Sequence, residues 1–172
     1  YLKPYYEMVL SQQDDGVCMN YGMLKTSSTH YSGVFYNNSV ATMNIGTWFI
    51  STLIKQIESG NTEVKNWGIV KYPHAEGVEP GSTLGTITTL GISKASKNKD
   101  AAWKFVEFVT GEKGANVVAS TGTFPAMSND AIRETVSSIE GFPTDQNSVD
   151  ALETANVYLE MPLHDKAGEI EV

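Results

Sequence analysis

Apolar residues recur every three or four positions along several stretches of the chain, which is the spacing of one face of an α-helix. In three of these stretches a glycine follows the last apolar residue, and glycine commonly stands just past the end of a helix. The sequence therefore predicts a chain built largely of helices. These cover residues 2–16, 47–60, 98–111, 112–120, 129–139 and 145–159.

A second pattern, with apolar side chains at alternate positions or in β-branched runs, predicts short strands between the helices. The predicted strands are 40–45, 67–73 and 85–92. Polar stretches rich in Ser, Thr, Gly and Pro predict loops over 17–33 and 74–83, and Asn37-Asn38-Ser39 predicts a turn between extended segments. Short strands separated by helices indicate a layered α/β domain.

Composition narrows the class of protein. The chain has 172 residues, 41% of them hydrophobic and 19% charged, which is typical of a folded domain or of a piece of a larger two-lobed one. Its net charge of −8 argues against nonspecific binding to nucleic acid or to an anionic membrane. Cys18 is the single cysteine, so no internal disulfide is possible. Because the chain begins at Tyr1 and ends in what resembles an unfinished helix, we expect a fragment or a processed chain.

No motif in the sequence indicates catalysis or metal binding. Each histidine lacks a second His or Cys at the spacing that metal sites use. Those histidines are His30, His74 and His164. Cys18 has no base near it in sequence, and Asp14-Asp15-Gly16 lacks the glutamate that a calcium loop needs twelve positions on, where Lys25 stands. We therefore expect no enzyme activity, no metal and no cofactor.

One stretch carries a positive signal. Residues 35–50 predict a strand that turns through Gly46-Thr47-Trp48 into an amphipathic helix. Such a corner places the free N–H groups of a helix N-terminus beside an aromatic ring. Hydroxyl oxygens of a sugar can accept from those groups while its C–H face lies on the indole. The alternative is that Trp48 is only a core residue, as most large aromatics are.

The same stretch resembles the signature Phe-x-x-Gly-Lys-x-Ala-Met-x-x-x-Gly-x-Trp, with Asn38-Ser39 in place of Gly-Lys and Met43 at or beside the methionine position. Further motifs follow in order over about residues 34–127. They are Trp67-Gly68 with Pro73, the run Gly85–Phe105, Phe108-Val109-Thr110, and Thr123–Ala126. Together they resemble family 1 of the extracellular solute-binding proteins of ABC importers, the group that includes the maltodextrin-binding protein.

This resemblance implies an α/β fold of the type II periplasmic-binding-protein class, in which the chain crosses between two lobes. By analogy, residues 1–84 would belong to the C-terminal lobe and 85–91 would be a strand that crosses the hinge. Residues 92–140 would pack their helices on the N-terminal lobe, and 141–172 would return. The chain would then be mostly a C-terminal lobe with hinge-crossing helices.

The resemblance also implies a site. Trp48 matches a family position that commonly stacks on sugar, Thr47 lies at the same helix start, and Thr86 and Ile87 match residues that line the cleft. Ala167-Gly168 stands where many members carry a further aromatic contact. The implied ligand is a mono- or oligosaccharide, and the implied partners are a membrane permease and the parent protein's N-terminal lobe. The implied location is extracellular or periplasmic, with a lipoprotein anchor on the full-length protein.

Other interpretations stay open. The same fold could bind a polyamine, a metal or an organic anion. A secreted glycosidase would need two carboxylates facing each other in a cleft, and sequence does not give their separation. A fragment that binds nothing by itself is a further alternative.

Overall fold

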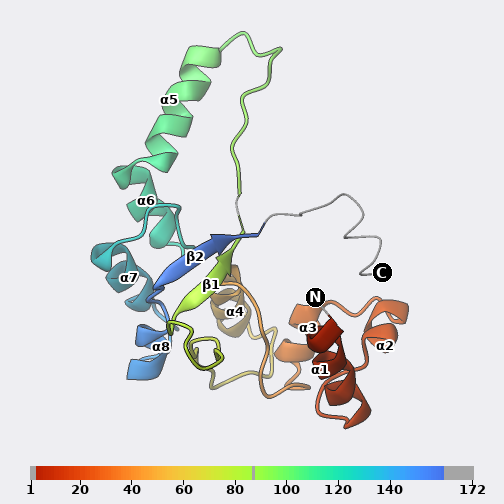
Figure 1. The fold of residues 1–172 in the computed structure, drawn as a ribbon. Coiled ribbons are helices and arrows are strands. Elements are labelled where there is room, and N and C mark those ends of the chain that lie inside the picture. The colour runs from red at the N-terminus through yellow and green to blue at the C-terminus, as the bar shows by residue number, and fades with distance from the viewer. Residues whose placement is uncertain (1–2, 87, 161–172) are drawn as a thin grey trace.

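The computed structural model describes residues 3–86 and 88–160. Ten elements occur in this part of the chain (Figure 1). The helices are α1 (Lys3–Asp14), α2 (Tyr21–Thr26), α3 (Tyr31–Tyr36), α4 (Trp48–Glu58), α5 (Lys99–Thr110), α6 (Glu112–Ala119), α7 (Asp130–Ser137) and α8 (Gln146–Asp150). The strands are β1 (Ser82–Gly85) and β2 (Asn156–Leu159). None of the described helices is long and apolar enough to cross a membrane.

Five of the predicted helices are confirmed. α1, α4, α5, α6 and α7 form where apolar spacing predicts them, with ends within a few residues of the prediction. The last predicted helix is wrong over most of its length, because α8 stops at Asp150 and residues 156–159 form a strand instead. That strand pairs with a partner far away in sequence, and a local pattern carries no information on such pairing.

The strand predictions are largely wrong. Residues 40–45 and 67–73 form no ladder, and β1 begins before the predicted 85–92 strand and shares only Gly85 with it. β1 and β2 are parallel, with Ser82 opposite Asn156. In the two segments where no strand forms, apolar side chains pack against the hydrophobic core instead. Met43 and Ile45 lie against one cluster of buried residues, and Ile69 lies against a second cluster.

The predicted loop over 17–33 is also wrong, since it contains α2 and the start of α3. Side-chain caps start both helices. The Asn20 side chain accepts from the Met23 amide at 3.1 Å, and the His30 ring nitrogen accepts from the Ser32 amide at 3.4 Å. Caps of this kind offset the weak helix preference of a short polar segment.

The core is divided into two clusters by α4. One cluster joins Ile50 and Ile54 to side chains from α6, α7 and the segments after α7 and α8. Those partners are Ala115, Ala119, Ile132, Val136, Phe142 and Leu152. The other cluster joins Phe49 and Leu53 to Val64, and Trp67 lies against both clusters. α4 is therefore held from two sides, which fixes its N-terminus.

α5 is different, because it has no buried residue. Figure 1 shows it extending away from the rest of the chain at the end of a long connection from β1. Its large apolar side chains are at least half exposed, namely Trp103 at 58%, Phe105 at 61% and Phe108 at 50%. The division into lobes stays a prediction, with α6 and α7 packed on α4 here.

Candidate functional site

The Gly46-Thr47-Trp48 corner lies where the chain enters α4. Phe49 and Ile50, the next two side chains, are 6% and 5% exposed, whereas Trp48 is 49% exposed. Within the described chain Trp48 is therefore not a buried core residue: its neighbours along the helix anchor the element, and Trp48 itself is half exposed.

The indole of Trp48 lies directly over Gly46. A Cβ placed on Gly46 would overlap the six-membered part of the ring, at atoms Cζ3, Cε3 and Cη2. The ring can occupy this position only because residue 46 has no side chain. Below the corner, Phe49 packs against Phe35 and Tyr36 of α3 with ring centroids 5.6 Å apart in both pairs.

The polar groups of the corner are fewer than the sequence predicts. The Phe49 amide donates to the Gly46 carbonyl and the Ile50 amide to the Thr47 carbonyl, each at 3.1 Å. These two N–H groups are used within the first tight turn of α4, so the expectation that they are free for a ligand is wrong. Thr47 itself is exposed and its side chain makes no capping bond, so its hydroxyl is the polar side-chain group that the corner offers.

Thr86 directly follows the last residue of β1. Its hydroxyl donates to Glu160 Oε2 at 2.9 Å across 74 residues of sequence. In the described part of the chain no hydrogen bond joins Thr47 or Trp48 to Thr86. Ile87, like His164 and Ala167-Gly168, lies outside the described residues.

Glu160 was not predicted as a site residue. It follows β2 directly, and no sequence motif marks it. Only the parallel register of β1 and β2 places its carboxylate beside Thr86. Because that register joins segments about 74 residues apart, local patterns could not have shown it.

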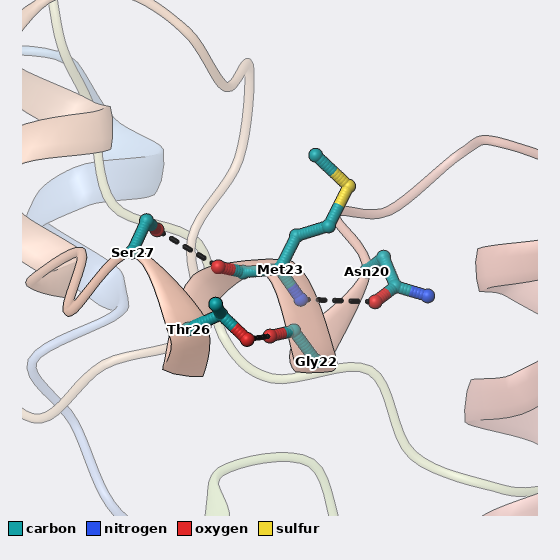
Figure 2. Close-up of a pocket in the computed structure, with 5 residues that line it drawn as sticks. All are labelled: Asn20, Gly22, Met23, Thr26 and Ser27. Atoms are coloured by element: carbon teal, nitrogen blue, oxygen red, sulfur yellow. Dashed lines mark hydrogen bonds between the residues drawn. The ribbon is translucent and has the colours of Figure 1, made fainter.

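Two surface hollows occur elsewhere. The first, at α2, has a volume of about 510 Å³ and is shown in Figure 2. It is lined by Asn20, Gly22, Met23, Thr26 and Ser27. Its polar side chains are used locally: the Thr26 hydroxyl donates to the Gly22 carbonyl at 2.7 Å, and the Ser27 hydroxyl donates to the Met23 carbonyl at 2.8 Å. This hollow contains no predicted site residue, and its Asn20, Thr26 and Ser27 side chains bond to nearby backbone groups. We therefore assign it no role.

The second hollow lies between α7 and the α8 region, with a volume of about 370 Å³. Its lining is Asp130, Arg133, Glu134, Ser137, Val149, Asp150 and Glu153. Arg133 is already paired with Asp130, and Glu153 with Lys71 at 3.6 Å. This hollow also contains none of the predicted site residues.

Two titratable groups have shifted pKa values, and neither is a predicted site residue. The Ser148 hydroxyl and amide, which both donate to Asp145, lower the pKa of that carboxyl below its ordinary 3.8. Burial raises the pKa of Tyr36 above its ordinary 10.0. Among the described residues, no group of three or more His, Cys, Asp or Glu side chains is placed to hold a metal ion, and Cys18 is exposed.

Comparison with known proteins defines the class. The family model described as "Bacterial extracellular solute-binding protein" matches residues 4–116, which is well over half of the chain. The chain belongs to this family of bacterial extracellular solute-binding proteins. The match confirms the resemblance of the sequence motifs. It assigns the chain to a family of solute-binding proteins.

A solved structure supports the same conclusion. The chain is similar to a protein from Rhizobium etli described as a sugar transporter, whose crystal structure is in an open conformation. The identity is 44%, the TM-score is 0.79, and the match covers 99% of this chain but 43% of that one. This confirms the α/β fold of the type II binding-protein class, and the chain spans less than half the length of that relative. The search of curated proteins gave no match.

Proposed function

We propose that the chain forms part of the solute-binding receptor of an ABC importer that captures a mono- or oligosaccharide. Family membership supports a solute receptor, and the 44% identical relative is described as a sugar transporter. The observation that carries the proposal is Trp48, a half-exposed indole fixed over a glycine at the start of a helix that is buried on both sides.

The chemistry of this site is recognition without a reaction. The face of the indole stacks on the C–H face of a sugar ring, and the Thr47 hydroxyl exchanges hydrogen bonds with sugar hydroxyls. Hinge closure then encloses the solute between two lobes. The net charge of −8 favours a neutral solute over an anionic one.

The partners follow from the same proposal. A protein of the relative's length would supply a second lobe, and the exposed apolar side chains of α5 are a surface that such a lobe would cover. The closed receptor would then present its solute to a membrane permease. We place the receptor in the extracellular or periplasmic space, held by a lipoprotein anchor.

The alternatives differ in ligand or in chemistry. A polyamine, a metal or an organic anion would need charged groups around the site, and the corner offers an indole and a hydroxyl. A glycosidase would need a pair of carboxylates across the bound sugar.

A thermal-shift panel on the full-length protein separates these possibilities, since a ligand that binds only the native state raises its melting temperature. The panel contains neutral mono- and oligosaccharides, spermidine, divalent cations and citrate. We expect a rise with one or more neutral saccharides, and no reducing-end release when that saccharide is incubated with the protein. A rise with spermidine, a cation or citrate alone would contradict the proposal, as would hydrolysis of the sugar.

A further inference from the structure

We propose that Glu160, oriented by Thr86, is a specificity-determining residue that selects neutral, hydroxyl-rich solutes and rejects anionic ones. This inference rests on the proposed function and goes beyond it, because it names a second polar side of the site and the class of solute that this side admits.

The backbone places Glu160 securely. β1 and β2 run parallel, so both chains leave the small sheet at the same edge, with Gly85 opposite Leu159. The Glu160 amide donates to the Gly85 carbonyl at 3.0 Å and extends the ladder by one bond. A Cβ on Gly85 would come within 2.6 Å of Val157 Cγ1, so the two strands approach closely there. The position of Glu160 relative to Thr86 is therefore set by paired backbone.

The side chain is oriented as well. One carboxylate oxygen, Oε2, accepts the Thr86 hydroxyl at 2.9 Å. Within residues 3–86 and 88–160, the other oxygen accepts no hydrogen bond, and Glu160 belongs to none of the ion pairs. Both side chains are exposed. Among the described residues, Thr86 thus holds one oxygen of the carboxylate and the other oxygen has no partner.

The place and the charge indicate the ligand. In open α/β sheets, ligands bind outside the carboxyl ends of parallel strands, which is the edge that carries this pair. An ionised carboxylate only accepts hydrogen bonds, so it suits the hydroxyl donors of a sugar. An ionised carboxylate also repels a carboxylate or phosphate on the solute. A neutral saccharide supplies hydroxyl donors and carries no negative charge, whereas a uronic acid supplies the donors but also carries a carboxylate.

The test compares a matched pair of solutes on the full-length protein. The probes are the neutral hexose that raises the melting temperature most and the uronic acid with the same ring. In Glu160→Gln, we expect the affinity for the hexose to fall at least about tenfold, as for loss of a hydrogen bond to a charged group. The affinity ratio of hexose to uronic acid should fall at least as much. Thr86→Val should lower hexose affinity by a smaller factor, because it frees the carboxylate without removing it.

Glu140→Gln, which removes an exposed carboxylate beyond α7, is the matched control and should leave both affinities unchanged. If Glu160→Gln binds hexose and uronic acid as the wild type does, the inference is overturned. The same holds if Glu160→Gln and Thr86→Val lower only the melting temperature. Wild-type protein that binds no saccharide would instead overturn the proposed function, so the two failures are distinguishable.

Discussion

The indole of Trp48 and the missing side chain of Gly46 share one small space, and the candidate site depends on that arrangement. The backbone of Gly46 is not among the glycines with positive φ. An alanine there would therefore meet no backbone strain, only the ring. Gly46 thus allows a substitution that moves the indole and leaves the core of α4 intact.

We expect Gly46→Ala to lower saccharide affinity at least about tenfold, because the added Cβ displaces the indole from its stacking position. The melting temperature should change by no more than a few degrees, since Trp48 is half exposed. The matched control is Gly33→Ala within α3, where an added Cβ meets nothing within 4 Å. Alanine stabilises a helix interior by up to about 1 kcal/mol relative to glycine, so Gly33→Ala should bind normally and melt no lower. Wild-type affinity in Gly46→Ala would show that the ring position does not matter.

At the residue level, the sequence predicted local geometry where a motif fixes it. The place of Trp48 at a helix start could be predicted because a glycine and an apolar stripe lie within a few residues of it, and its role in binding stays a prediction. The role of the helix amides could not, because a tight first turn of α4 uses two of them. Glu160 could not be predicted either, since its partner Thr86 is brought close only by the β1–β2 pairing.

At the scale of elements, segments set by a local apolar pattern were predicted correctly, and segments set by contacts distant in sequence were not. α4 and α7 carry apolar stripes that pack on the core, and both form where the spacing predicts them. Residues 67–73 have a strand-like pattern, but the Ile69 amide donates at 2.9 Å to the hydroxyl of Ser148, which is fully buried, and not to a neighbouring strand. A side chain thus takes the place of a ladder bond, and periodicity does not distinguish the two.

Ser148 also bonds to Asp145, the cap of α8, and we expect this carboxylate to make the helix sensitive to pH. Asp145 caps α8 and accepts from the Ser148 hydroxyl at 2.7 Å and from the Ser148 amide at 3.0 Å. Its pKa in the folded protein is lowered below 3.8, mainly by the Ser148 hydroxyl. The stabilisation is therefore fully present above the unfolded-state pKa, and it is lost as pH falls through the lower folded-state pKa.

We expect the free energy of unfolding of wild type to exceed that of Asp145→Asn at neutral pH. The difference should shrink as the pH is lowered below about 4, because the unfolded carboxyl is then protonated. Urea denaturation at a series of pH values measures it. Ser148→Ala removes the main donor to Asp145. The difference in free energy of unfolding between Ser148→Ala and the double variant Asp145→Asn/Ser148→Ala should therefore depend less on pH than the difference between wild type and Asp145→Asn. A wild-type advantage that stays constant down to pH 2 would contradict this account of the cap.

At the scale of the whole molecule, the length of the chain and its exposed apolar surface both indicate part of a larger receptor. The chain spans 43% of a relative that it otherwise matches with a TM-score of 0.79, and the apolar side chains of α5 remain exposed. Both facts fit a chain that supplies one wall of a cleft. The fold class could be predicted from ordered motifs. The lobe boundaries stay a prediction.

The central claim is that Trp48 forms the stacking surface for a saccharide. Isothermal titration calorimetry of the full-length protein tests it most directly, with the saccharide that gives the largest thermal shift. We predict that Trp48→Ala loses at least about tenfold in affinity, while Trp48→Phe, which keeps an aromatic face, retains most of it. Both variants should melt within a few degrees of wild type, because the ring is half exposed. Equal affinity in wild type and Trp48→Ala would contradict the claim.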